Sequence, residues 1–148
     1  MTKKIKDPML PEQFRIIKVL RETHDTFTLE LQANRINGGF KFSPGQFNML
    51  YVYGTGEIPI SISGNPDNGD KLIHTTRIVG TVRKVLGRLK ANDVIGVRGP
   101  FGTNWPIKEA VQKDVVIVTG GIGLAPLRPS IDHFLDNREK YGRLTLQN

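Results

Sequence analysis

The stretch "VVIVTGGIGLAPLRPSI", residues 115–131, decides how the last third of the chain folds. Its first four residues are all β-branched, which is typical of a parallel strand covered on both faces. A glycine turn follows, and apolar residues then recur on one face of a predicted helix at Leu127, Ile131, Phe134 and Leu135. Pro126 and Pro129 fit near the first turn of that helix, where backbone N–H groups lack intrahelical partners. With "YGRLTLQ" as a second strand, the pattern predicts a β–turn–α–β unit.

The glycine turn has a chemical interpretation. Glycines lack a Cβ, so a pyrophosphate can approach the backbone, and the N-terminus of the following helix favours its negative charge. A tight turn between strand and helix that binds nothing explains the same pattern, and the glycines alone leave the two interpretations open.

The first hundred residues carry the pattern of β structure. Phe27, Leu29 and Leu31 alternate with Thr28 and Glu30, which is the period of a half-buried strand. Further strands are expected in "EQFRIIKVLRET", "FNMLYVYG", "IPISISG", "KLIHTTRIVG" and "NDVIGVRGPFG", and one helix in "TVRKVLGRLK". Short strands at this spacing predict a closed antiparallel barrel or a sandwich. The boundary with the C-terminal unit is expected between residues 99 and 113.

Composition excludes several kinds of site. The 148 residues include no cysteine, which rules out disulfides, cysteine-ligated iron–sulfur clusters and thiolate catalysis within this chain. His24, His74 and His133 lie far apart, so we predict no metal ligand and expect each to be an ordinary surface or half-buried residue. No catalytic acid or base is predicted either.

Charge and hydropathy limit the partners. The net charge is +7, but the cations are spread along the chain, so we expect no nucleic-acid binding. No apolar run approaches the roughly 18 residues of a membrane span, and no secretory signal is evident, so we expect no membrane association and a cytoplasmic location.

The longer string "TGGIGLAPLRP" resembles the nicotinamide-domain motif of the ferredoxin–NADP reductase superfamily. Within it the chain most resembles the FAD/NAD(P)-binding gamma subunits of cytoplasmic hydrogenases and sulfhydrogenases. The corresponding subunit of anaerobic sulfite reductase and the electron-transfer subunit of dihydroorotate dehydrogenase are close relatives of these. Matching stretches, among them "SPGQF", "PISIS", "RIVG" and "LKANDVIGVRGPFG", extend the resemblance from about residue 10 to 146.

This resemblance implies a fold and two domains. An antiparallel, Greek-key β-barrel of the ferredoxin-reductase-like FAD-binding kind is expected over residues 8–106. An incomplete α/β Rossmann-like unit, a truncated NAD(P)-binding βαβ unit, is expected over residues 107–148.

The resemblance also implies cofactor-binding residues. The first flavin motif corresponds to Ile58, Pro59, Ile60 and Ser61. The family commonly has arginine where Ile58 stands, so a cation for the FAD phosphates is missing there. The residues implied by the second flavin motif are Thr75, Thr76, Arg77, Gly80, Val82 and Arg83. The residues implied for NAD(P)H are Thr119, Gly120, Gly121, Gly123 and Pro126.

The sequence leaves two questions open. Our hypothesis is that Arg83 or Arg77 supplies the charge missing at Ile58; the alternative is that Arg83 only solvates a helix face and FAD binding is weakened or lost. The nicotinamide site is expected to be incomplete. The chain is then a truncated, split-gene or expressed fragment, or is completed by another chain or a second copy, or is a retained flavin module.

The function implied by the resemblance is electron transfer. Hydride passes from NAD(P)H to FAD, and electrons then leave singly toward an iron–sulfur or hydrogenase-type partner subunit. The alternatives are a flavin-only module and a non-catalytic subunit that docks or assembles a redox complex.

Overall fold

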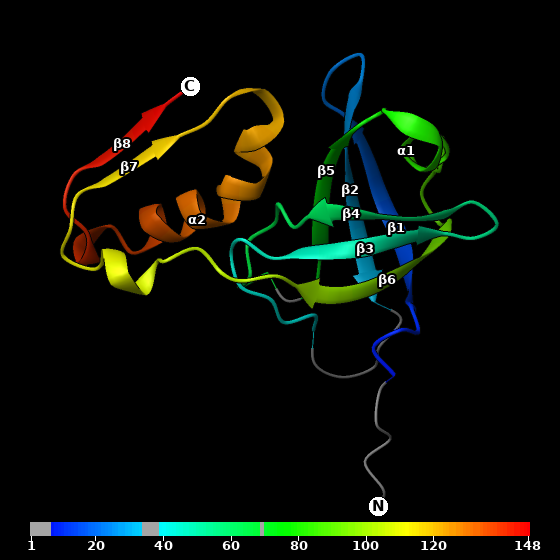
Figure 1. The fold of residues 1–148 in the computed structure, drawn as a ribbon, viewed down its shortest axis with the longest axis horizontal. Helices are drawn as coiled ribbons and strands as arrows, with labels where there is room; N and C mark the ends of the chain where they lie inside the picture. The colour runs from blue at the N-terminus through cyan, green and yellow to red at the C-terminus, as the bar shows by residue number, and fades with distance from the viewer. Residues whose placement is uncertain (1–6, 34–38, 69) are drawn as a thin grey trace, which may run out of the picture.

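The computed structural model of the chain describes residues 7–33, 39–68 and 70–148. Its first part is a β-barrel, and its second part is a smaller α/β unit beside the barrel (Figure 1). The elements of the barrel are β1 (Glu12–Arg21), β2 (Thr26–Ala33), β3 (Phe47–Val52), β4 (Gly56–Ser61), β5 (Leu72–Arg77), α1 (Gly80–Leu86) and β6 (Val94–Phe101). The elements of the α/β unit are η1 (Lys108–Ala110), β7 (Val115–Val118), η2 (Gly121–Gly123), α2 (Leu124–Asp136), η3 (Arg138–Lys140) and β8 (Leu144–Gln147), where η denotes a 3₁₀ turn.

The barrel strands pair in an order that differs from their order in the sequence. The order across the six-stranded sheet is β4-β3-β6-β1-β2-β5, and all of these pairs are antiparallel. A bridge between Ile62, just after β4, and His74 on β5 brings the two edge strands together. The antiparallel barrel predicted from the sequence is therefore confirmed.

Alternating apolar residues build the core of the barrel. Phe27, Leu29 and Leu31 on β2 are at most 1% exposed, as their spacing predicted. Complete burial of such side chains stabilises the fold by about 1.5–3 kcal/mol each. Thr28, on the opposite face of the same strand, is also buried, and its hydroxyl is satisfied by hydrogen bonds to Glu22 and Thr75.

Helix α1 is shorter than the sequence predicted. It ends at Leu86, whereas the pattern indicated a helix through residue 90. The chain tightens after Gly87, because Arg88 N–H bonds to the Val85 carbonyl three residues back instead of continuing the four-residue repeat. Leu86 is nevertheless fully buried, so this short helix still covers the barrel core.

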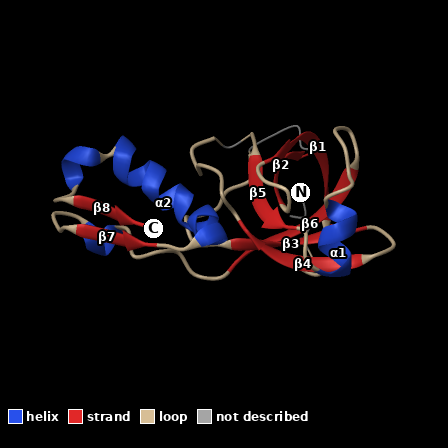
Figure 2. Ribbon diagram, turned by 90° about the horizontal axis from the view of Figure 1, so that it is seen from above, coloured by secondary structure: helices blue, strands red, loops and turns tan. Residues whose placement is uncertain are grey.

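The α/β unit confirms the predicted β–turn–α–β order. β7 and β8 are parallel neighbours, with Val115 opposite Leu144. Helix α2 lies along one side of this pair (Figure 2). Phe134 of α2 packs edge-on against Tyr141, with ring centroids 4.7 Å apart.

Three details of this unit correct the sequence-based expectation. β7 is not covered on both faces: Val116 and Val118 are 62% and 68% exposed, because the described residues place a helix over only one face. Leu135 is 61% exposed and does not share the buried face of α2 with Phe134. Pro129 lies in the second turn of α2, where its missing N–H leaves one helical hydrogen bond unmade.

The segment after β6 joins the two parts. The Trp105 backbone N–H donates to the Pro44 carbonyl of the barrel at 2.8 Å, and its indole N–H donates to the Pro126 carbonyl of α2 at 3.4 Å. A Cβ on Gly45 would come within 2.8 Å of the Trp105 nitrogen, so glycine permits this close approach. The barrel and the start of α2 therefore face each other across a cleft.

Candidate functional site

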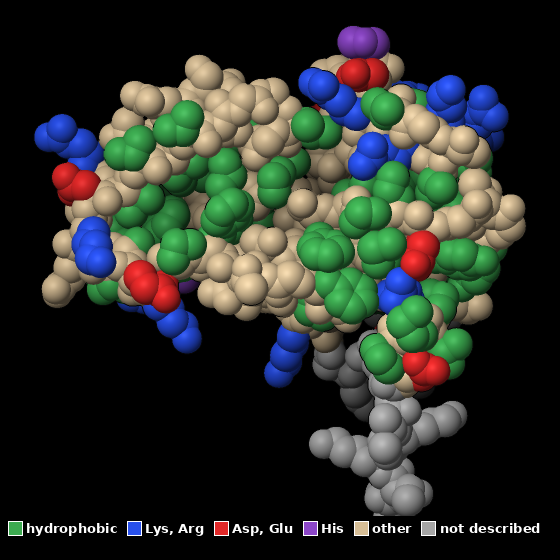
Figure 3. Space-filling model, in the orientation of Figure 1, with side chains coloured by type: hydrophobic (Ala, Val, Ile, Leu, Met, Phe, Trp, Pro, Cys, Tyr) green, Lys and Arg blue, Asp and Glu red, His purple; other side chains and the backbone are tan. Residues whose placement is uncertain are grey.

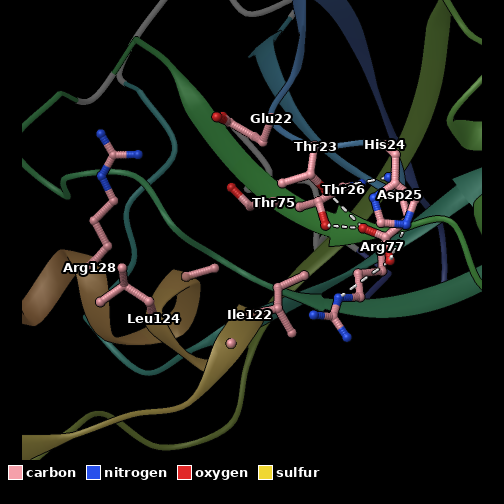
Figure 4. A pocket seen from close by; sticks show the side chains of 12 residues that line it. Glu22, Thr23, His24, Asp25, Thr26, Thr75, Arg77, Ile122, Leu124 and Arg128 are labelled. Carbon is pink, nitrogen blue, oxygen red and sulfur yellow. Dashed lines mark hydrogen bonds and ion pairs between the residues drawn. The ribbon is translucent and has the colours of Figure 1, made fainter. Parts of the chain in front are cut away.

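The cleft between the barrel and α2 consists of two adjoining hollows. Their volumes are about 610 Å³ and about 210 Å³, and they share the lining residues Thr75, Ile122 and Ala125. Figure 4 shows the larger hollow, with barrel residues on one side and Ile122, Leu124 and Arg128 on the other. The site is thus built jointly by the barrel and the α/β unit.

The smaller hollow brings the three sequence motifs together. The predicted site residues that line it are Pro59, Ile60, Ser61, Thr75, Thr76, Arg83, Gly123 and Pro126. They come from the end of β4, from β5, from α1 and from the beginning of α2. The predicted residues Arg77 and Gly121, together with Thr75, line the larger hollow.

Five predicted residues are not among the described residues that line either hollow: Ile58, Gly80, Val82, Thr119 and Gly120. Ile58 and Val82 instead pack against the barrel core. Gly80 has a φ of +75°, which glycine adopts without strain, so its identity has a backbone reason at the start of α1. The structure therefore separates the residues that face the cleft from Ile58 and Val82, which pack against the barrel core, and from Gly80, which has a backbone role.

Arg83 has an unsatisfied polar atom at the cleft. Its Nε is buried, and no hydrogen-bond partner for it occurs within the described part of the chain. Buried N–H groups almost always have a partner, and a guanidinium pairs well with phosphate oxygens. The donor set of the smaller hollow therefore suits an anion such as a cofactor phosphate.

Arg77 lines the larger hollow, whereas Arg83 lines the smaller one. Its guanidinium lies 3.8 Å from the Asp25 carboxylate, and its side chain is 49% exposed. The pKa of Asp25 is held below its ordinary value, chiefly because the Thr23 hydroxyl donates to it and then because Thr26 does. The ionised Asp25 holds Arg77 beside the glycine turn.

The glycine turn leaves open backbone at the edge of the cleft. Gly121 has a φ of +53°, and a Cβ there would lie 3.6 Å from an Arg77 guanidinium nitrogen. A Cβ on Gly123 would come within 3.2 Å of the Thr119 hydroxyl. A Cβ on Gly120 meets none of the described atoms within 4 Å, so packing against these residues does not require glycine at that position.

His74 is a structural residue of the site that the sequence analysis missed. It was expected to be exposed or half-buried, but it is fully buried. Its Nδ1–H donates to the Ser61 carbonyl at 2.9 Å, and Asn48 donates to its Nε2 at 3.2 Å. Burial lowers the pKa of His74 to about 4, so the ring is neutral near pH 7. Its place between the inward-facing Leu72 and Thr76 was the signal that indicated this burial.

Neither a group of metal ligands nor a membrane-spanning helix is found among the described residues. The described part of the chain holds no group of three or more His, Cys, Asp or Glu side chains placed to share a metal ion. Over the same residues, no helix combines the length and the apolar character needed to cross a membrane.

No protein-family model matches the chain. Curated relatives do, and the match to one of them covers nearly the whole chain. The chain is 35% identical to sulfhydrogenase 1 subunit gamma of Pyrococcus furiosus over 144 residues, which is 96% of this chain and 49% of that subunit. It is also 35% identical, over 121 residues, to a probable dihydroorotate dehydrogenase B (NAD(+)) electron transfer subunit of Methanocella arvoryzae. That match covers 82% of this chain and 42% of the relative. The chain spans about half the length of the curated relatives it matches.

Solved structures share the fold. A ferredoxin NADP+ reductase from Neisseria gonorrhoeae, with bound FAD and NADP, matches with a TM-score of 0.76 at 21% identity. The match covers 90% of this chain and 55% of that chain. Phthalate dioxygenase reductase matches with a TM-score of 0.78 at 14% identity, over 90% of this chain and 42% of that chain.

These similarities confirm what the motifs indicated. The chain belongs to the ferredoxin–NADP reductase superfamily, and its relatives include the sulfhydrogenase gamma and dihydroorotate dehydrogenase electron-transfer subunits that its motifs resemble.

Proposed function

We propose that this chain binds FAD in the cleft and takes part in electron transfer between NAD(P)H and an iron–sulfur or hydrogenase-type partner subunit. One observation carries the proposal: the end of β4, the Thr75–Thr76 pair, Arg83 and the glycine turn line a single hollow, although they are far apart in the sequence. These are the segments that the family motifs implied. The relatives named above, an electron transfer subunit among them, support the same function.

The residues of the cleft fit a flavin nucleotide. Ser61 and Thr75 provide polar groups at the wall, Pro59 and Ile60 provide apolar surface, and Arg83 provides a buried donor for a phosphate. FAD, when bound, supplies the capacity to accept a hydride and to release electrons one at a time. The protein positions it: His74 holds the Ser61 carbonyl at 2.9 Å.

In this proposal residues 8–106 form the FAD-binding domain and residues 107–148 contribute to NAD(P)H binding. The turn formed by Thr119, Gly120, Gly121 and Gly123, with Pro126 after it, receives a nucleotide phosphate. Gly120 supports this role, since an added Cβ there meets nothing among the described atoms. The remainder of the nicotinamide site comes from polypeptide outside these residues, whether covalently attached, on another chain or on a second copy. The proposed location is the cytoplasm.

A second candidate function is a non-catalytic subunit that docks or assembles a redox complex, with or without flavin. It is favoured by an apolar groove of about 340 Å³ that runs along β7 and α2. Hydrophobic side chains gather on this face of the α/β unit (Figure 3). Val116, Val118 and Leu146 are each more than half exposed, which is typical of a surface that meets another polypeptide.

Absorption spectroscopy separates these functions. The purified chain is measured with and without added FAD, and then titrated anaerobically with NADH and with NADPH. A bound flavin that is bleached by nicotinamide supports the electron-transfer function. A bound flavin that stays oxidised indicates a flavin module, and no binding at saturating FAD refutes the flavin proposal and leaves the docking subunit.

A further inference from the structure

A chain of side-chain hydrogen bonds leads from the edge of the barrel into the cleft. The Thr28 hydroxyl donates to the Glu22 carboxylate at 2.8 Å, and the hydroxyl oxygens of Thr28 and Thr75 are 2.8 Å apart. Ser63 completes the chain, with its oxygen 3.1 Å from that of Thr75. Figure 4 shows the oxygens of Glu22 and Thr75 pointing toward the space between the barrel and α2.

The carboxylate imposes a direction on this chain. An ionised carboxylate accepts hydrogen bonds and donates none, so the single proton of the Thr28 hydroxyl goes to Glu22. Thr28 must then accept from Thr75, which uses the only proton of the Thr75 hydroxyl. The Ser63 hydroxyl has two acceptors within reach, the Ile73 carbonyl at 3.4 Å and the Thr75 oxygen at 3.1 Å. Because the Thr75 proton is already used toward Thr28, the hydrogen bond between Ser63 and Thr75 requires Ser63 to be the donor. Each step follows from the rule that a hydroxyl has one proton and two lone pairs.

Thr75 is left with one unused lone pair and no free proton. It lines both hollows and is half-buried, whereas Thr28 behind it is only 7% exposed. A ligand that reaches the Thr75 oxygen therefore meets an acceptor. A second acceptor at that point is repelled, and an N–H group is bound.

We infer that Glu22, acting through Thr28, sets the Thr75 hydroxyl as a hydrogen-bond acceptor toward the cleft, so that the cleft selects a heteroaromatic ring that presents an N–H group there. The inference rests on the proposed function, because it takes the flavin ring of FAD as the ligand. An oxidised flavin ring carries one N–H, between two carbonyl groups, and otherwise offers acceptors. Glu22 and Thr28 are positioning residues in this scheme.

Three substitutions test the scheme. Thr28→Val has nearly the same shape but removes the hydroxyl that links Glu22 to Thr75. The proton of the Thr75 hydroxyl is then free to turn toward the ligand. Glu22→Ala removes the acceptor that sets the direction. Glu22→Gln removes the charge but keeps an oxygen that accepts from Thr28. Thr55→Val, at an exposed turn between β3 and β4, is the matched control.

The measurement is FAD affinity by quenching of flavin fluorescence, at a temperature where thermal melts show every variant folded. Thr28→Val and Glu22→Ala are expected to raise the Kd for FAD about three- to tenfold, the factor that one net hydrogen bond confers. Glu22→Gln and Thr55→Val are expected to stay within about twofold of the parent. If Glu22 acted only as a structural anion, Glu22→Gln would weaken FAD binding as much as Glu22→Ala does. A near-parent Kd in Glu22→Gln therefore distinguishes the directed hydrogen bonds from a structural role.

The outcomes separate this inference from the proposed function. If the parent binds FAD and the Thr28→Val and Glu22→Ala variants bind it equally well, the directed chain is refuted while the flavin site stands. If Glu22→Gln weakens binding as much as Glu22→Ala, the carboxylate acts through its charge and the inference is likewise overturned. If the parent binds no FAD, both proposals are overturned.

Discussion

Replacing Arg83 by alanine is the most direct test of the cofactor phosphate site. Arg83 is half-buried, lines the smaller hollow beside Ser61 and Gly123, and has a buried Nε for which the described residues offer no partner. A hydrogen bond to a charged group contributes about 1.5–3 kcal/mol net. Loss of one such bond to an FAD phosphate corresponds to an increase in Kd of about 10- to 150-fold.

The assay is a flavin titration of the parent and of three variants at fixed ionic strength. Arg83→Ala is expected to show the full loss of affinity. The FAD affinity of Arg83→Lys is expected to lie between those of the parent and Arg83→Ala, because an ammonium keeps the charge but lacks the planar fork of donors. Arg88→Ala is the control: Arg88 is exposed and is not among the described residues that line either hollow.

Equal FAD affinity of the parent and Arg83→Ala would refute the argument. The Arg83 side chain would then only solvate a helix face, and the charge missing at Ile58 would have to come from Arg77 or be absent. A uniform loss in Arg83→Ala and Arg88→Ala would point to general electrostatic attraction, which increasing salt screens, and not to a specific contact.

Three further predictions concern stability. Burial lowers the pKa of His74 to about 4, so as pH falls the unfolded chain takes up the proton before the folded chain does. The contribution of the neutral, buried ring to the free energy of unfolding is therefore fully present above about pH 6.5, and up to about 3 kcal/mol of it is lost as pH falls to about 4. His74→Asn should flatten this pH dependence in urea titrations. A Cβ on Gly99 collides with the Asn48 side chain, whereas one on Gly120 meets nothing among the described atoms. Gly99→Ala should thus cost about 1–3 kcal/mol in chemical unfolding, and a similar cost for Gly120→Ala would contradict this explanation. Val118→Lys should leave the Tm within about 2 °C, since this side chain is 68% exposed, and a fall of more than about 5 °C would show that the face is covered in solution.

Local patterns were sufficient for most of the fold. The alternation of Phe27, Leu29 and Leu31 predicted a half-buried strand, and the apolar run at residues 115–118 predicted the strand before the glycine turn. These patterns work because side-chain periods of two and 3.6 residues follow from backbone geometry alone. Errors arose where tertiary packing acts: α1 stops at Leu86, and Leu135 lies outside the buried face of α2.

The residues of the candidate site could be predicted only in part. Family motifs indicated Ser61, Thr75 and Arg83, and these three residues do line one hollow. No motif indicated His74 or Glu22, because their roles depend on neighbours from other strands: His74 bonds to Ser61, and Glu22 reaches Thr75 through Thr28.

By itself, then, the sequence determined the β-barrel, the β–turn–α–β unit and the superfamily, since each depends on local periodicity or on a short string such as "TGGIGLAPLRP". The tertiary structure decided which of the implied residues face a common cleft, which polar side chains are buried, and which way the hydroxyl of Thr75 is directed. It also decided that Val116 and Val118 lie on an exposed face. The physical reason is that burial and hydrogen-bond direction are properties of neighbours in space, and the barrel order β4-β3-β6-β1-β2-β5 makes neighbours of strands that are distant in sequence.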